Sequence, residues 1–261
     1  RLKGIKVVTS LEELPSTKEI NFVLNLAGES LVSGRWNKEL KQKFINSRLD
    51  MTNKLYDYFT NTNSYPEVII SGSAVGYYGP QEDNFIDEDS SYNNSYTNHL
   101  CTLWENNASR FVHLGSRVCF LRIGIVLGEG EGALKRMIPP FNFGLGGKLG
   151  TGKQWFPWIH IKDQINLIFH CLEHQELSGA INSCSPNPVT NQEFTRELGS
   201  VLSRPVFLSM PSFIAKIIFG EMANELLLKG QRVVPKKALN SGFIFIYSHI
   251  DQALKNILVS N

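Results

Sequence analysis

Two short apolar segments, each ending in small polar residues, lie on either side of a long amphipathic segment early in the chain. The first covers residues 21–29 and the second covers residues 67–74. Between them, residues 36–60 carry apolar side chains at spacings of three, four and seven, which is typical of a helix with one buried face. This order predicts a β-α-β unit of a parallel sheet, in which ligands bind beyond the carboxyl ends of the strands. The candidate site residues at these strand ends are Ala27, Gly28, Glu29, Ser71, Gly72 and Ser73.

One position on the predicted helix departs from the apolar pattern. Arg48 comes four residues after Phe44 and three before Met51, so a guanidinium lies where a hydrophobic side chain is expected. Long basic side chains can bury their stems and extend their charged ends to an edge. Arg48 therefore either reaches the sheet edge and binds backbone carbonyls, or contacts a ligand.

The rest of the chain alternates predicted strands and helices and becomes less regular after residue 178. The strands cover residues 118–127, 158–160, 180–184 and 205–210, and the helices cover about 95–113, 162–174, 190–202 and 211–229. We expect a doubly wound α/β domain with a smaller α+β lobe. The sheet domain is assigned to residues 1–127 and about 155–182, and the lobe to residues 128–154 and 183–261.

Composition and charge narrow the classes of partner. The 26 basic and 24 acidic residues are scattered, which is unlike the basic stripe of a nucleic-acid-binding surface. The four cysteines form no C-x-x-C pair and have no histidine at metal-ligand spacing. The apolar segment at residues 207–219 is interrupted by Pro211 and Lys216. We therefore expect a cytoplasmic protein with reduced thiols, no metal, and neither nucleic acid nor a membrane as partner.

A glycine-rich segment imitates a phosphate-binding loop without its context. Residues 147–153 fit G-x-x-x-x-G-K, but Gln154 follows where a hydroxyl for Mg²⁺ is required, and an aromatic segment follows where a helix should begin. The glycines and the neighbouring Trp155 and Trp158 instead favour an adjustable apolar pocket wall, with a core between the two lobes as the alternative.

Several motifs together resemble a known family. They are Asn25-Leu26-Ala27-Gly28-Glu29 with Arg35-Trp36, Ser47-Arg48, the residues 71–79 (Ser-Gly-Ser-Ala-Val-Gly-Tyr-Tyr-Gly), Leu121-Arg122-Ile123-Gly124, the residues 158–163 (Trp-Ile-His-Ile-Lys-Asp), and Gly230-Gln231-Arg232-Val233-Val234-Pro235. Across residues 21–247 the chain resembles the NAD-dependent epimerase/dehydratase-like proteins of the extended short-chain dehydrogenase/reductase superfamily, and within them the YfcH-like epimerase family.

The resemblance implies a Rossmann-like domain that binds NADP or NAD and a C-terminal substrate lobe. It also implies a further β-α-β unit with a glycine-rich turn before Arg1, because no such turn occurs at the start of this sequence. We expect cofactor contacts from Leu26, Ala27, Gly28, Glu29, Arg48, Ser71, Gly72, Arg122 and Gly124. We expect substrate contacts from Tyr78, Trp155, Trp158 and Arg232.

The catalytic residues implied by the resemblance are only partly present. The superfamily uses a serine, which Ser73 matches, and a Tyr-x-x-x-Lys pair whose lysine lowers the tyrosine pKa and holds the nicotinamide ribose. No lysine occurs between Lys54 and Lys135, and aligning the helix on Glu105 puts Cys101 at the lysine position and Thr97 at the tyrosine position. A tyrosine without a neighbouring ammonium keeps a pKa of about 10 and is a poor base near neutrality. The candidate replacements are Tyr77, Tyr78, Tyr96 and His99, with Ser73, Tyr77 and His99 taken as the catalytic set.

The sequence thus predicts an NAD(P)-dependent oxidoreductase or epimerase-like protein acting on a small hydroxylated or nucleotide-sugar-like substrate. One alternative is a non-catalytic dinucleotide-binding sensor or regulator, related to cell division or the envelope. Another is a scaffold that has lost cofactor binding. A homodimer is left open.

Overall fold

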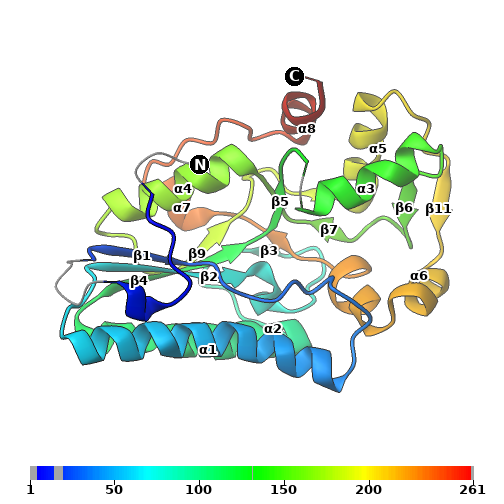
Figure 1. The fold of residues 1–261 in the computed structure, drawn as a ribbon. Helices are drawn as coiled ribbons and strands as arrows, with labels where there is room; N and C mark the ends of the chain where they lie inside the picture. The colour runs from blue at the N-terminus through cyan, green and yellow to red at the C-terminus, as the bar shows by residue number, and fades with distance from the viewer. Residues whose placement is uncertain (1–4, 15–19, 131, 260–261) are drawn as a thin grey trace.

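The computed structural model describes residues 5–14, 20–130 and 132–259, and its centre is a parallel sheet of four strands (Figure 1). In spatial order these are β1 (Phe22–Asn25), β2 (Val68–Ala74), β4 (Arg117–Ile123) and β9 (Gly179–Ser183). The two apolar runs that the sequence marks as strands are β1 and β2, which pair in parallel with Asn25 beside Ser71. The predicted α/β fold with a parallel sheet is confirmed. The further β-α-β unit expected before Arg1 lies outside the described residues.

The register of the sheet places three polar residues side by side near its carboxyl edge. Ser73 of β2 lies beside Arg122 of β4, and Arg122 lies beside Asn182 of β9. Neighbours across a sheet at the same register share a face, because side chains alternate along each strand. This Ser73–Arg122–Asn182 row is the framework of the site described below.

Helices cover both faces of the sheet (Figure 1). One face carries α1 (Lys38–Thr62) and α2 (Tyr96–Ser109), and the other carries α4 (Ile161–Glu173) and α7 (Lys236–Asn240). Ile69 of β2 packs in one cluster with Phe59 of α1, whereas the next residue, Ile70, packs in another with Leu167 of α4. Successive side chains of β2 point to opposite faces of the sheet, and helices cover both faces. The first half of β2 is therefore apolar at every position.

The predicted strand at residues 118–127 is two strands in the structure. β4 ends at Ile123, and β5 (Ile125–Leu127) pairs with β8 (Trp158–His160) instead of continuing in the main sheet. A Cβ on Gly124 would lie 2.8 Å from the Pro157 carbonyl oxygen, so only glycine lets the two backbones approach this closely. The prediction of one continuous strand is wrong at this glycine, where the chain turns to a new partner.

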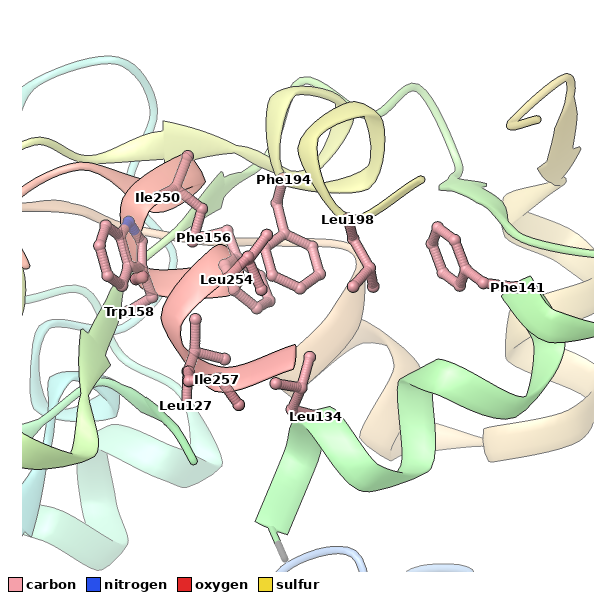
Figure 2. Packing of buried hydrophobic residues seen from close by; sticks show 11 residues of the cluster. Leu127, Leu134, Phe141, Phe156, Trp158, Phe194, Leu198, Ile250, Leu254 and Ile257 are labelled. Carbon is pink, nitrogen blue, oxygen red and sulfur yellow. The ribbon is translucent and has the colours of Figure 1, made fainter. Parts of the chain in front are cut away.

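A further hydrophobic cluster lies apart from the two faces of the main sheet. The remaining longer elements are α3 (Gly132–Asn142), β6 (Gly147–Leu149), β7 (Trp155–Phe156), β10 (Val189–Thr190), α5 (Asn191–Val201), β11 (Leu208–Met210), α6 (Ser212–Phe219) and α8 (Ile250–Val259). Figure 2 shows Trp158, Phe156 and Phe194 gathered with aliphatic side chains of α3, α5 and α8. Phe156 and Phe194 stack with ring centroids 4.2 Å apart. Trp158, which the sequence places in a substrate pocket, is fully buried here.

Short elements connect these layers. They are η1 (Leu11–Glu13), η2 (Val75–Tyr78), β3 (Phe85–Ile86), η3 (Arg110–Leu114), the π-helix η4 (Ala223–Leu227) and β12 (Arg232–Val233). Within the described ranges, no helix combines the length and the apolar character needed to span a bilayer. The same ranges contain no group of three His, Cys, Asp or Glu residues that could hold a metal ion. All four cysteines are free and buried.

Candidate functional site

A buried carboxylate ties together two members of the row at the carboxyl edge of the sheet. The Ser73 hydroxyl donates to Glu105 Oε1 at 2.6 Å. Arg122 donates from Nε to Glu105 Oε1 and from Nη2 to Glu105 Oε2, each at 2.9 Å. A bidentate guanidinium and a hydroxyl therefore hold the carboxylate in one orientation. Arg122, for which the sequence predicts a cofactor contact, is therefore paired with an acidic residue of the fold.

Two tyrosines extend this network to the third member of the row. Arg122 Nη1 donates to the Tyr78 hydroxyl at 3.0 Å, and that hydroxyl donates to Asn182 Oδ1 at 2.7 Å. The guanidinium carbon of Arg122 also lies 3.4 Å from the centroid of the Tyr77 ring. Burial raises the pKa of Tyr78 well above its ordinary value, so its side chain remains a phenol. Tyr78 is fully buried in this network.

Helix α2 brings three residues of one face to the end of β2. Thr97, Cys101 and Glu105 are spaced by four residues, so their side chains lie on the same side of the helix. The thiol of Cys101 donates to the Ala74 carbonyl at 3.7 Å, one residue beyond the Ser73 that Glu105 binds. Burial and then the Glu105 charge raise the pKa of Cys101 to about 11, which keeps it a thiol at neutral pH.

The residue at the expected tyrosine position is bound to the C-terminal part of the chain. The backbone N–H and the hydroxyl of Thr97 both donate to Glu225 Oε2, at 3.1 Å and 3.0 Å. Glu225 belongs to the π-helix η4, a rare conformation that is frequent at functional sites. Neither Thr97 nor Cys101 supplies the phenol or the ammonium of the usual proton relay.

Arg48 lies at the carboxyl end of β1. Its Nη1 donates to the carbonyls of Phe44 at 2.9 Å and Glu29 at 3.2 Å, which agrees with the carbonyl-binding interpretation made from the sequence. Its guanidinium carbon is 4.9 Å from the centroid of the Trp104 ring. Within the described residues, Arg48 Nε and Trp104 Nε1 are both buried without a hydrogen-bond partner. Two unused donors therefore lie close together in this part of the molecule.

Glycine is required where β2 passes Trp104. A Cβ on Gly72 would lie 2.7 Å from the outer edge of the Trp104 indole ring, closer than real contacts allow. Similarly, a Cβ on Gly28 would lie 3.0 Å from the guanidinium carbon of Arg48. Two of the glycines predicted from the strand ends thus lie directly against the two side chains with unused donors.

The other residues that the sequence predicts for the site lie apart from one another in the structure. His99 is exposed on α2, and Leu26 is 48% exposed beyond β1. The Arg232 guanidinium lies between the rings of Phe85 and Trp155, at 3.7 Å and 4.3 Å from their centroids. The structure thus brings Arg232 and Trp155 together, while Tyr78 and Trp158 are buried elsewhere. Whether any of these residues touches a substrate stays a prediction.

Sequence reasoning missed some members of the site. In the sequence analysis, Glu105 was used only to align the helix with the Tyr-x-x-x-Lys pattern. It lies one helical turn after Cys101, and a carboxylate on the same face as a buried residue could have indicated a site residue. Asn182 lies inside a short predicted strand, where a buried amide is unusual and also informative. Glu225 gave no signal because its partner is 128 residues away.

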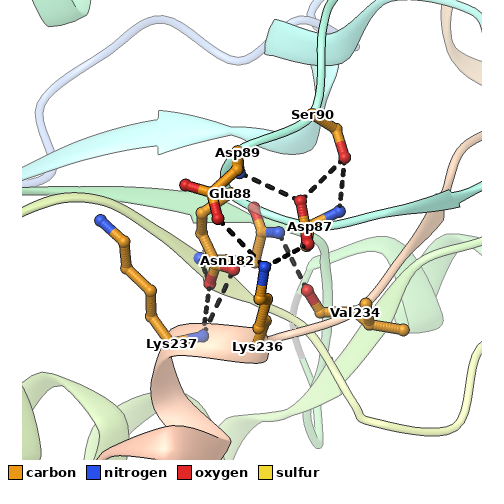
Figure 3. Close-up of polar contacts among 8 residues, drawn as sticks. All are labelled: Asp87, Glu88, Asp89, Ser90, Asn182, Val234, Lys236 and Lys237. Atoms are coloured by element: carbon orange, nitrogen blue, oxygen red, sulfur yellow. Dashed lines mark hydrogen bonds and ion pairs between the residues drawn. The ribbon is translucent and has the colours of Figure 1, made fainter.

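A second buried carboxylate joins the end of the row to the C-terminal segment (Figure 3). Glu88 Oε1 accepts hydrogen bonds from the backbone N–H of Asn182 at 3.0 Å and of Lys237 at 3.2 Å. On either side of Glu88, Asp87 and Asp89 bind Lys236 at 2.8 Å and 3.0 Å. This acidic segment therefore fixes α7 to the sheet.

Replacing Glu88 with glutamine is expected to change how stability depends on pH. Burial raises the pKa of Glu88 above its ordinary value of 4.5, so the folded protein keeps this proton to higher pH than the unfolded chain. The stability contributed by the protonated form is fully present below pH 4.5 and is lost as the pH rises through the raised pKa. Compared with Glu88→Gln, the natural protein should therefore lose stability with rising pH by up to about 1.4 kcal/mol per pH unit.

Urea unfolding of both proteins across this pH range measures the difference. A glutamine oxygen still accepts both backbone N–H groups, so the comparison isolates the proton. The control is Glu82→Gln, which makes the same substitution at an exposed carboxylate on the same segment. A flat difference for Glu88→Gln would contradict the expectation.

Comparisons with known proteins identify the family and agree with the fold. The family model described as "NAD dependent epimerase/dehydratase family" matches residues 5–183, and a domain of unknown function (DUF1731) matches residues 210–257. The chain is 42% identical to "Epimerase family protein SDR39U1 homolog, chloroplastic" of Arabidopsis thaliana, over 98% of this chain and 73% of the plant protein. It is 37% identical to "Epimerase family protein YfhF" of Bacillus subtilis, over 95% and 80% of the two chains. The crystal structure of human epimerase family protein SDR39U1 (isoform 2) with NADPH superposes with a TM-score of 0.85 at 34% identity, covering 92% of this chain and 82% of the human chain.

Proposed function

Because the chain belongs to the NAD-dependent epimerase/dehydratase family, we propose that it is an NAD(P)-dependent oxidoreductase or epimerase that acts on a small hydroxylated or nucleotide-sugar-like substrate. The observation that carries the proposal is the Ser73 hydroxyl, which donates to the buried Glu105 carboxylate at the carboxyl edge of a parallel sheet. This edge is where doubly wound sheets bind their ligands. The human relative solved with NADPH supports the choice of cofactor.

The residues at the ends of β1 and β2 fit a nicotinamide cofactor. Arg48 Nε and Trp104 Nε1 are buried donors without partners in the described part of the chain. Buried donors are rarely left unpaired, and the hydroxyl and amide oxygens of a nucleotide can accept from them. Gly28 and Gly72 let Arg48 and Trp104 pack directly against the strand ends, because a Cβ at either glycine would meet these side chains. Such a cofactor supplies the hydride acceptor or donor of the reaction.

Ser73 and Glu105 supply the proton transfer. A carboxylate only accepts hydrogen bonds, so the short contact uses the Ser73 proton, and it is through its lone pairs that the Ser73 oxygen accepts a hydrogen bond from a substrate hydroxyl. When the substrate is oxidised, its hydroxyl proton passes to Ser73 Oγ while the Ser73 proton passes to Glu105 Oε1. In the reverse direction both protons return, and Ser73 donates to the substrate carbonyl oxygen. Arg122 holds Glu105 in place from the opposite side.

This arrangement makes a Tyr-Lys pair unnecessary for moving the proton. Cys101 stays a thiol and Thr97 is bound to Glu225, so neither acts as a base near neutral pH. Ser73 keeps the catalytic role predicted from the sequence, and its charged partner is Glu105. Tyr77 lies on the other side of Arg122, where it orients the guanidinium.

Titration of the full-length protein with NADPH, followed by the fluorescence of the reduced nicotinamide, tests cofactor binding. We expect a saturable signal with one site per chain. Absence of saturable binding by both NADPH and NADH would contradict the proposed function and favour a scaffold.

Replacing Ser73 with alanine is expected to lower turnover about 10²–10⁴-fold, the usual contribution of a positioned acid-base group. The NADPH affinity should stay unchanged, because the substitution removes a proton carrier and not a cofactor contact. Turnover is followed by NADPH absorbance with a carbonyl or alcohol substrate found by screening. The control is Ser109→Ala, whose hydroxyl donates only to the Asn106 carbonyl at the end of α2. Equal turnover of Ser73→Ala and the natural protein would rule out this role.

A further inference from the structure

The buried guanidinium of Arg48 lies near Cys101, the position on α2 where a lysine is expected. The resemblance implies a lysine on α2 that holds the nicotinamide ribose, and this chain has Cys101 there. Arg48 reaches the same region from α1, and only 9% of its surface is exposed. The fold thus brings in a cation from a different helix.

The contacts of Arg48 place its guanidinium between the end of β1 and the face of α2. On one side, a Cβ on Gly28 would meet the guanidinium carbon at 3.0 Å. On the other, the guanidinium lies over the ring of Trp104, which is one helical turn beyond Cys101. The Arg48 charge also opposes the rise that burial causes in the Cys101 pKa, which agrees with a guanidinium near the thiol.

The Arg48 charge lacks a close ionic partner in the described part of the chain. Its Nη1 donates to two neutral carbonyls, and its Nε is buried without an acceptor among the described residues. The carboxylate of Glu29, whose charge acts on Arg48, is bound by Lys43 at 2.8 Å. Burying a charge without a partner is costly, and burial lowers the pKa of Arg48 accordingly. A ligand that supplies oxygen acceptors would offset this cost.

We propose that Arg48 binds the nicotinamide half of the cofactor, taking the place of the lysine expected on α2. The guanidinium donates to ribose hydroxyl and carboxamide oxygens at the end of β1, while Ser73 and Glu105 handle the proton. Arg48 on α1 thus supplies the cofactor-binding positive charge that the resemblance places on α2. The inference rests on the proposed function, because it requires that the protein binds NADPH.

The test compares NADPH binding by the full-length natural protein, Arg48→Gln and Arg48→Lys. Glutamine can still donate to the Phe44 and Glu29 carbonyls but carries no charge, and lysine restores the charge without the planar fork. Arg48→Gln should bind NADPH at least about 10-fold more weakly, which corresponds to the loss of hydrogen bonds from a charged group. Arg48→Lys should recover most of this affinity. Both variants should bind ADP, which lacks the nicotinamide half, as the natural protein does.

The matched control is Arg117→Gln. Arg117 also donates to two backbone carbonyls, those of Leu177 and Leu172, but it lies at the amino end of β4, at the opposite edge of the sheet. NADPH affinity should be unchanged in this variant. Circular dichroism and melting temperature confirm that each variant is folded before binding is compared.

Three results would overturn the inference. Unchanged NADPH affinity in folded Arg48→Gln would show that Arg48 only supports the fold. Equal weakening of ADP binding would place its effect outside the nicotinamide half. Arg48→Lys no better than Arg48→Gln would show that the charge is unimportant. If the natural protein itself fails to bind NADPH, the proposed function fails first, and this inference with it.

Discussion

Replacing Arg122 with alanine is expected to lower the free energy of unfolding by about 3–5 kcal/mol, the range for removing one partner of a buried ion pair. Arg122 and Glu105 are 5% and 7% exposed, so the carboxylate left behind cannot be solvated by water. The same substitution removes a donor from the Tyr78 hydroxyl and the cation beside Tyr77. Urea or guanidinium unfolding measures the loss directly.

Two further variants show whether the unpaired Glu105 carboxylate causes this loss in the free energy of unfolding. In Arg122→Met combined with Glu105→Gln no charge is left unpaired, so the double variant should lose less stability than the sum of the two single substitutions. The control Arg196→Ala removes an exposed arginine that pairs with the neighbouring Glu197, and it should not change the unfolding midpoint. A loss below about 1 kcal/mol for Arg122→Ala would show that water reaches the pair, as at exposed salt bridges.

Replacing Trp158 with alanine is expected to cost about 3–5 kcal/mol of stability, as large-to-small substitutions of buried aromatic residues do. The side chain is fully buried in the cluster of Figure 2, between aliphatic residues of several elements. Removing it leaves a cavity that the packed surroundings only partly fill. Thermal and chemical unfolding measure the effect.

Trp155 provides the comparison for Trp158, because it belongs to the same aromatic segment. Trp155 is only partly buried and lies against Arg232, so Trp155→Ala should cost clearly less stability. If Trp158 instead lined a substrate pocket, Trp158→Ala would change the KM for the substrate and leave stability nearly intact. That result would restore the interpretation made from the sequence.

The sequence was sufficient for the fold because the periodicities are local. The apolar run in residues 67–74 and the helical spacing in residues 36–60 each lie within one element, and both elements form as predicted. The small residues at the strand ends also located the site edge, since Gly28 and Gly72 lie against Arg48 and Trp104. Local patterns therefore predict which segments meet and at which edge.

The chemistry of the site could not be predicted in the same way, because it depends on tertiary pairing. Glu105 on a helix and Arg122 on a strand each look like ordinary charged residues until the sheet register puts Arg122 beside Ser73. The link from Thr97 to Glu225 joins distant parts of the chain. The break at Gly124 depends on the approach of Pro157, which no local pattern records. The sequence identified Ser73 and Arg122 but gave no reason to connect them.

The Ser73–Arg122–Asn182 row also affects how the chain reaches its native state. A slip of one residue between two neighbouring strands would turn the side chains of one strand to the opposite face of the sheet. Arg122 would then enter an apolar layer without Glu105, at the cost of an unpaired buried charge. The row therefore penalises a one-residue slip of β4 against its neighbours more than a purely apolar sheet edge would. The ion pair that holds Glu105 for proton transfer thus also favours the correct strand alignment during folding.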